Sequence, residues 1–283
     1  MIKILNLKTI LSTLRKKIRF ILFLLLIVLI QVSLVSCKLN EKTPNLLQTI
    51  QKRNKIIAGV KFDSRPFGFI DKDEKLKGID VELTREIARR ILGSADAVEF
   101  KPVTSSNRIL LLTSGDIDLI IATMTINDQR ARVIDFSDSY FTAGQALLVR
   151  KDSNIASITN LNNKKIIVVL GSTAEKNIRQ LAPKAVIKGY KTYTEAFSAL
   201  KSGEADALTT DDTIITGFLH DNPDFKMLSA RYTKEFYGIG FRKGEDTVSF
   251  QQVVNDTLDE IKADGTLNKI IKKWMNESHA KAE

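Results

Sequence analysis

Polar side chains follow an apolar run near the middle of the chain, where their types favour the binding of a carboxylate. The run Leu119 to Ala122 is typical of a buried strand, and a helical pattern that ends at Gly115 precedes it. Thr123, Thr125 and Arg130 follow the run. Ligands of open α/β sheets lie beyond the carboxyl ends of strands, and a guanidinium beside hydroxyls suits a carboxylate. We therefore expect an anion site at this corner.

A second copy of the same unit predicts a second lobe. The sequence LTSGDID of Leu112 to Asp118 returns as LKSGEAD in Leu200 to Asp206, about 90 residues later, again between a helical pattern and an apolar strand. Such a repeat indicates two similar lobes rather than one continuous sheet. The second strand ends near Asp211 and Asp212. One lobe thus offers Arg130 and the other a carboxylate, the two charges that hold the ends of an amino-acid zwitterion.

Several longer stretches carry a family resemblance. They are GVKFDSRPFGF (59–69), GIDVELTREIA (78–88), QALLVRKD (145–152), GSTAE (171–175), ADALTTDDTIITGF (205–218) and YGIGFRK (237–243). In this order the chain resembles the extracellular solute-binding proteins, family 3, of polar amino-acid ABC importers, and among them the glutamate/aspartate receptors. The resemblance implies a two-lobed α/β fold of the type II periplasmic-binding-protein kind, with two hinge crossings and a ligand cleft between the lobes.

The resemblance also implies roles for individual residues around the backbone end of the ligand. Arg130 would clamp the α-carboxylate, helped by Thr123 and Thr125. A planar guanidinium meets a planar carboxylate through two parallel hydrogen bonds. Asp211 would accept the ammonium group.

The side-chain end of the ligand would lie between both lobes. By the same resemblance Lys61 and the pair Ser105 and Arg108 would face a distal carboxylate, which Ser172 and Thr173 would reach from a helix amino end in the second lobe. Phe67 or Phe62 would form a wall. The structural alternatives are a surface ion pair for Arg130, a solvated position for Lys61, a core position for Phe67, and a helix cap for Ser172, Thr173 or Asp212.

The first 36 residues have the pattern of an export leader. Lys16, Lys17 and Arg19 precede an unbroken apolar run of 11 residues, Phe20 to Ile30, which is short for a membrane span and suits a secretory segment. Cys37 follows small residues, as in a bacterial lipobox. We expect residues 1–36 to be a lipoprotein signal peptide and residues 37–50 to be the lipidated Cys37 with its tether. The alternative is an uncleaved signal anchor.

The domain prediction for the remainder follows the repeat and the apolar pattern. Residues 51–147 and 240–276 would form the first lobe, and residues 148–239 the second. Crossings between the lobes are expected at Ala146 to Val149 and at Phe236 to Phe241. The protein should be a monomer that is exported to the periplasm or to the outer face of the membrane, held by its lipid, and that delivers an amino acid to a permease.

Composition excludes several other classes. The net charge of +10 falls to about +4 without the leader, which holds six basic residues and no acid, so nucleic-acid binding has little support. The single cysteine allows no disulfide framework. The two histidines, His220 and His279, lie far apart in sequence, so we expect no metal and no cofactor.

Three alternative functions stay open at this point. Glutamine or another polar amino acid could replace the acidic ligand. A periplasmic cyclohexadienyl dehydratase has a similar fold and would turn over arogenate or prephenate, although no nucleophile-elbow sequence supports an acyl-transfer enzyme. Sensor domains also use this fold, but the chain ends at Glu283 without a signalling domain.

Overall fold

The computed structural model describes residues 11–26 and 44–279. Residues 11–26 are helical, and in the described ranges no helix is both long and apolar enough to cross a membrane. Cys37 lies outside the described residues, and so does the tether up to residue 43. Within the described residues, 45–279 belong to a compact unit of their own.

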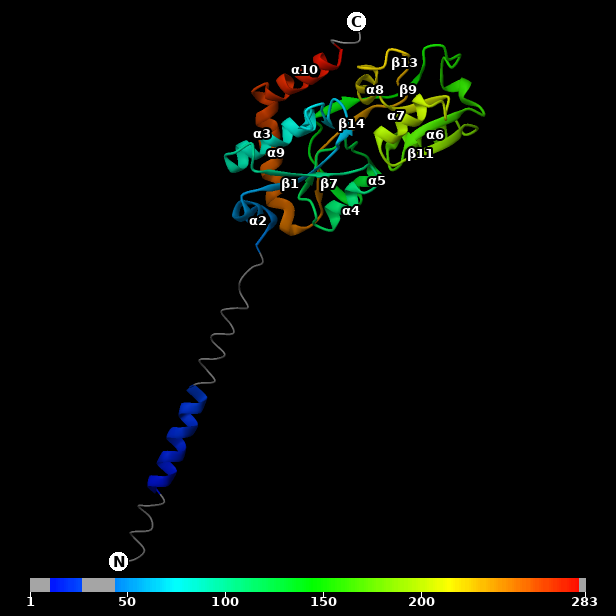
Figure 1. Ribbon diagram of the computed structural model, residues 1–283. Helices are drawn as coiled ribbons and strands as arrows, with labels where there is room; N and C mark the ends of the chain where they lie inside the picture. The colour runs from blue at the N-terminus through cyan, green and yellow to red at the C-terminus, as the bar shows by residue number, and fades with distance from the viewer. Residues whose placement is uncertain (1–10, 27–43, 280–283) are drawn as a thin grey trace, which may run out of the picture. The chain divides into compact units, whose positions relative to one another are not determined.

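The first lobe is built on a mixed sheet of five strands. In spatial order these are β5 (Val98–Pro102), β1 (Ile56–Val60), β6 (Leu119–Ile120), β15 (Gly240–Arg242) and β7 (Ile134–Phe136). Figure 1 labels β1 and β7 of this sheet. β1 is parallel to β5 and β6, whereas β15 is antiparallel to β6 and β7. A smaller antiparallel sheet contains β2 (Asp63–Ser64), β3 (Gly68–Ile70) and β4 (Leu76–Lys77).

Helices cover both faces of this sheet. Successive side chains of a strand point to opposite faces, so neighbouring residues of one strand pack against different helices. Leu119 belongs to one apolar cluster and its neighbour Ile120 to another. The Leu119 cluster includes side chains of α2 (Leu46–Arg53), α3 (Ile79–Leu92), α9 (Val248–Ala263) and α10 (Thr266–His279). The Ile120 cluster includes side chains of α4 (Arg108–Thr113). The short helices α5 (Asp128–Ala131) and η2 (Glu245–Thr247) complete the lobe.

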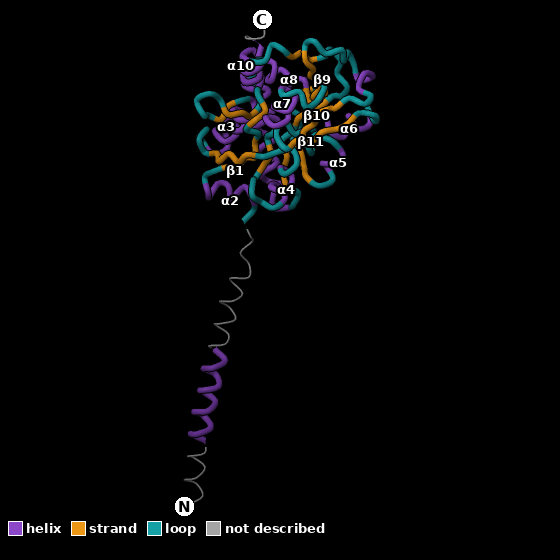
Figure 2. The backbone as a smooth tube through the Cα atoms, turned by 45° about the vertical axis from the view of Figure 1, so that its right-hand side comes forward, coloured by secondary structure: helices purple, strands orange, loops and turns teal. Residues whose placement is uncertain are grey.

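The second lobe repeats the plan. Its strands are, in spatial order, β11 (Val186–Tyr190), β10 (Lys165–Val169), β12 (Ala207–Asp211), β9 (Gln145–Arg150) and β13 (Phe225–Met227). α7 (Tyr193–Lys201) and α8 (Asp212–Leu219) pack into one apolar cluster, while α6 (Thr173–Leu181) and η1 (Ile158–Leu161) pack into the other. Figure 2 shows strands in orange and their flanking helices in purple. The two-lobed α/β prediction is confirmed.

Two antiparallel strands, β8 (Phe141–Ala143) and β14 (Glu235–Tyr237), form the hinge ribbon where the chain leaves the first lobe and returns to it. The crossing expected at residues 146–149 is therefore wrong. Those residues lie inside β9, which pairs with β12 in the second sheet from Gln145 to Val149. β9 lies between β12 and β13 and is buried, which explains why its residues 146–149 are all apolar. The domain boundary after residue 147 also falls within β9.

Two further boundaries need correction at the ends of the first lobe. The tether expected up to residue 50 ends earlier, because α2 begins at Leu46 after the capping residue Asn45. Ile50 of this helix is fully buried in the first core. At the other end α10 continues to His279, beyond residue 276.

The first core offers a direct test of the return of α9 to this lobe. Phe250 is fully buried and meets Phe241 of β15 edge to face, with ring centroids 6.1 Å apart. Phe250→Ala should lower the free energy of unfolding of the ligand-free protein by ~3–5 kcal/mol, since a large core side chain leaves a cavity. Urea unfolding followed by fluorescence of Trp274, the single tryptophan, measures this lobe.

Val248→Ala is the matched control, because Val248 is 60% exposed on the same helix. Its effect should stay within ~0.5 kcal/mol. Equal losses for both variants would contradict the packing of α9 described above.

Candidate functional site

A small cavity lies between the lobes at the carboxyl ends of β6 and β12. About 240 Å³ of space there is not filled by protein atoms. This figure includes space that is open to solvent. The lining of the cavity combines hydroxyls, two guanidinium groups and one carboxylate, from Ser105, Arg108, Thr123, Thr125, Arg130, Ser172, Thr173, Ala174, Tyr193, Thr210 and Asp211.

The backbone that follows β6 is held in a sharp turn by a buried carboxylate. Thr123 has a φ of +46°, in the left-handed region that a β-branched residue rarely adopts. Asp80 of α3 accepts the Thr123 N–H at 3.0 Å and the Tyr140 hydroxyl at 2.8 Å. Burial raises the pKa of Asp80 to about 6. Sequence analysis did not identify Asp80, because its partners are distant in sequence and only its position on a helix was visible.

Arg130 reaches the cavity from α5, whose first turn is capped by Asn127. Its guanidinium donates to the Thr125 carbonyl at 2.7 Å and, across the cleft, to the Gly171 carbonyl at 3.2 Å. Burial lowers the pKa of Arg130, with Glu235 and Asp211 acting in the opposite direction. A guanidinium has five N–H donors, so donors remain for a ligand.

Asp211 faces Arg130 from the end of β12 in the second lobe. It is 6% exposed, and the Tyr237 hydroxyl from the hinge ribbon donates to its carboxylate. Burial, and then the nearby Glu235 carboxylate, raises the pKa of Asp211 to about 7. A cationic group placed here would lower that pKa and be held by the ionised form.

A further cation, Arg108, lines the cavity, and another, Lys61, adjoins it. Lys61, which follows β1, is 1% exposed and donates to Ser105 Oγ at 2.9 Å. Its Nζ also lies 5.3 Å from the centre of the Tyr193 ring. Arg108 of α4 donates to the Ala122 carbonyl at 2.5 Å, while its buried Nε has no hydrogen-bond partner among the described residues.

The charge of Lys61 and Arg108 is costly because water is excluded. Burial and then the Arg108 charge lower the pKa of Lys61 to about 7. Burial, together with Arg130, lowers the pKa of Arg108 to about 9. A negatively charged solute would relieve this repulsion between cations.

The second lobe adds hydroxyl groups at the start of α6. Ser172 caps this helix by accepting the Glu175 N–H at 3.1 Å. Thr173 donates to Glu235, a 3% exposed residue of the hinge ribbon, at 2.9 Å. Ser172 is therefore a helix cap, as the structural alternative predicted, and it also lines the cavity.

Eight of the ten residues expected to bind ligand line this one cavity, and Lys61 adjoins it through Ser105. Phe67 does not. It is fully buried in the first core, where its ring packs against Phe141 and Tyr237 at centroid distances of 5.1 and 5.4 Å. The sequence analysis missed Tyr193 and Thr210. Tyr193 comes shortly after β11, and that place beyond a strand end could have indicated it.

The charged groups in and beside the cavity belong to no ion pair in the part of the chain that the structure describes. Over residues 11–26 and 44–279, neither Lys61, Arg108 and Arg130 nor Asp211 belongs to an ion pair within 4.0 Å. Within the same ranges no cluster of three His, Asp or Glu side chains could hold a metal ion. Buried charges are normally paired. The cavity is thus complementary to a solute that carries both signs of charge.

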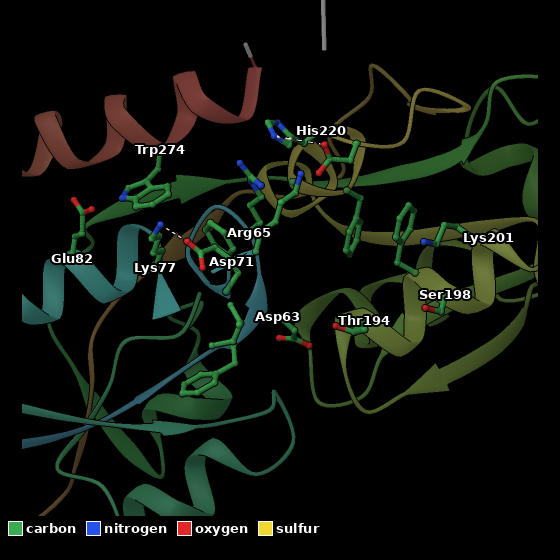
Figure 3. Close-up of a pocket in the computed structure, with 18 of the residues that line it drawn as sticks. Asp63, Arg65, Asp71, Lys77, Glu82, Thr194, Ser198, Lys201, His220 and Trp274 are labelled. Atoms are coloured by element: carbon green, nitrogen blue, oxygen red, sulfur yellow. Dashed lines mark ion pairs between the residues drawn. The ribbon is translucent and has the colours of Figure 1, made fainter. Parts of the chain in front are cut away.

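A larger groove opens elsewhere between the lobes, with Arg65, Lys77 and Trp274 on one side and Thr194 and Lys201 on the other (Figure 3). Two ion pairs lie in it: Lys77 pairs with Asp71, and Lys273 pairs with Glu82 at 2.5 Å. We place the solute site in the smaller cavity, because its charged side chains are buried, whereas those of the groove are partly or fully exposed.

Comparison with known proteins agrees with this architecture. The ABC transporter glutamine-binding protein GlnH of Bacillus subtilis is 43% identical over 242 residues, covering 85% of this chain and 88% of that protein. The glutamate-binding protein GluB of Corynebacterium efficiens is 30% identical and covers 88% of each chain. A solved ancestral arginine-binding protein bound to glutamine superimposes with a TM-score of 0.74 at 40% identity, covering 78% of this chain and 97% of that one.

The family model for bacterial extracellular solute-binding proteins, family 3, matches residues 56–277. This range contains both sheets, the hinge ribbon and every residue of the cavity. The fold is that of type II periplasmic binding proteins. The chain belongs to the bacterial extracellular solute-binding proteins, family 3.

Proposed function

We propose that this solute-binding protein of an amino-acid ABC importer binds an acidic amino acid, L-glutamate or L-aspartate, in the cavity between its lobes. One observation carries the proposal: two buried guanidinium groups and one buried carboxylate line the cavity, buried Lys61 adjoins it, and none of the four belongs to an ion pair within residues 11–26 and 44–279. A solute with two carboxylates and one ammonium group would pair with all four. Coulombic complementarity of this kind selects among solutes of similar size.

The backbone end of the amino acid would lie between Arg130 and Asp211. Arg130 has free N–H donors for the α-carboxylate, and Asp211 offers its carboxylate to the ammonium. Hydrogen bonds to charged groups contribute ~1.5–3 kcal/mol each. Because the two residues come from different lobes, the closed form makes both contacts and the open form only one. Ligand binding therefore favours closure about the hinge ribbon.

The side-chain end would meet mainly donors. Lys61 offers an ammonium and Arg108 a guanidinium whose Nε has no hydrogen-bond partner in the described part of the chain. The Tyr193 hydroxyl accepts from Thr210 at 3.1 Å and keeps its own hydrogen for the solute. A carboxylate accepts from all three groups, whereas an amide would leave its NH₂ group facing cations. This donor set favours glutamate over glutamine.

Glutamine is the second candidate, and the comparisons supply its support. The relative that is 43% identical is a glutamine-binding protein, and the ancestral arginine-binding protein was solved with glutamine. A neutral Lys61 amine, accessible because its pKa is about 7, could accept a hydrogen bond from the amide of glutamine. Direct titration with both solutes separates the two candidates.

We propose binding without chemical change of the solute, with export directed by residues 1–36 and anchoring through a lipid on Cys37. The apolar leader and the position of Cys37 support anchoring, although Cys37 lies outside the described residues. Turnover of prephenate or arogenate, followed by absorbance, would instead favour the dehydratase alternative.

Removal of the guanidinium tests the backbone end of the site. Arg130→Ala should weaken binding of every amino acid at least ~30-fold, because truncating one partner of a buried charge pair costs ~2 kcal/mol or more. Isothermal titration calorimetry measures the loss. Arg132→Ala, two residues away and exposed, is the matched control and should bind normally. Normal affinity in Arg130→Ala would remove Arg130 from the site.

The lysine tests the side-chain end. The wild-type protein should bind L-glutamate more tightly than L-glutamine, and Lys61→Met should reduce the affinity for glutamate far more, by ~10-fold or greater, because it removes a charge-assisted contact. Lys75→Met, an exposed lysine of the same lobe, is the control. Equal losses for the two solutes, or a wild-type preference for glutamine, would contradict an acidic ligand.

The pH profile distinguishes the same solutes independently. Asp211 must be ionised to hold an ammonium, so binding releases a proton below its pKa of about 7, and the affinity for either solute falls as the pH drops. Lys61 must be protonated to attract a carboxylate, so the affinity for glutamate also falls as the pH rises above about 7.

Calorimetric titrations between about pH 5.5 and 8.5 should therefore show a maximum near neutrality for glutamate and a plateau above neutrality for glutamine. A glutamate affinity that is independent of pH over this range would mean that neither group contacts the solute.

A further inference from the structure

The lobes also touch at a second place, of whose residues only Tyr193 lines the cavity. The residues concerned are Asp63 and Arg65, at β2 of the first lobe, and Tyr193 and Gly217, on α7 and α8 of the second. Asp63, Arg65 and Gly217 line the larger groove instead. Figure 3 shows Asp63 opposite the start of α7, next to Thr194.

Asp63 acts on the amino end of a helix in the other lobe. Its carboxylate accepts the backbone N–H of Tyr193, the first residue of α7, at 2.7 Å. The cap within the second lobe, Thr192, serves the Glu195 N–H at 3.1 Å and leaves the Tyr193 N–H for this contact. A carboxylate is favourable at a helix amino end because of the exposed N–H groups and the helix dipole. The bond can exist only while the lobes are together.

Gly217 allows the chain of the first lobe to approach α8 closely. It lies within α8, and its φ is not in the left-handed region, so the helix itself does not require glycine. Glycine weakens a helix relative to alanine. A Cβ at this position would lie 2.2 Å from the Arg65 carbonyl oxygen and 2.8 Å from its carbonyl carbon. The absence of a side chain is thus explained by the closed arrangement of the lobes.

Gly171 forms a comparable contact on the other side, where a Cβ would lie 2.8 Å from the Ser105 carbonyl oxygen. Gly171 has a φ of +79° and accepts a hydrogen bond from Arg130, so a substitution there would disturb the backbone and the cavity together. Gly217 has neither complication. It isolates closure from direct contact with the solute.

We propose that Asp63 and Gly217 form an interlobe latch that sets how readily the cleft closes and therefore scales the affinity for every solute by the same factor. The proposal rests on the proposed function only in that the cavity binds an amino acid. An apparent affinity is the intrinsic affinity multiplied by the fraction of competent protein, so a latch changes affinity without changing selectivity.

Gly217→Ala tests the latch with L-glutamate and L-glutamine as probes. Both affinities should fall at least ~10-fold and by the same factor, because the added methyl group overlaps the Arg65 carbonyl only in the closed form. Thermal unfolding of the ligand-free variant should be unchanged or shifted upward, since alanine favours the helix. Thr216→Ala, the adjacent residue of α8, is the matched control and should bind both solutes normally.

Small-angle X-ray scattering supplies a readout of closure itself. At saturating solute the wild-type protein should contract, while Gly217→Ala should stay more expanded. Asp63→Asn should show the same tendency, and Asp73→Asn, an exposed carboxylate of the same lobe, should behave as wild type.

Wild-type affinity and contraction in Gly217→Ala, or a loss confined to one solute, would overturn the latch. A preference of the wild type for glutamine would refute the acidic ligand but leave this test intact, because the latch predicts parallel losses whichever solute binds better.

Discussion

Unmatched buried charge is the constraint on which the rest of this structure depends. Lys61, Arg108, Arg130 and Asp211 are each at most 8% exposed, they lie in or beside one cavity, and within the described residues none of them belongs to an ion pair. Burying a charge without a partner is unfavourable, and the lowered pKa of Lys61 and raised pKa of Asp211 reflect that cost. A solute of complementary charge converts the same groups into favourable contacts. Specificity and closure therefore have one physical origin.

The scaffold explains how such groups can be kept in place. Each lobe ends a central strand at the cavity, β6 in one case and β12 in the other, and the residues just beyond supply the side chains. The hinge ribbon participates directly, because Tyr237 donates to Asp211 and Glu235 accepts from Thr173. The hinge ribbon is thus connected to residues that line the cavity by hydrogen bonds as well as by the backbone.

Sequence reasoning was successful where the signal was local. The repeated helix–glycine–strand unit predicted the two lobes, and the polar residues after each strand predicted most of the residues that line the cavity. It was unsuccessful where position depends on distant partners. The hydrogen bond from the Thr123 N–H to Asp80 could not be predicted from the sequence. Phe67 was expected in the cavity, but it packs against two rings of the hinge ribbon. β9 was misassigned because a doubly flanked buried strand has no alternating pattern.

A crystal structure of the protein with L-glutamate would test the central claim most directly. We expect the α-carboxylate on Arg130, the ammonium on Asp211, and the side-chain carboxylate within hydrogen-bonding distance of Lys61 or Arg108. A solute bound in the larger groove, or one whose side-chain carboxylate points away from both cations, would contradict the proposed pairing of charges.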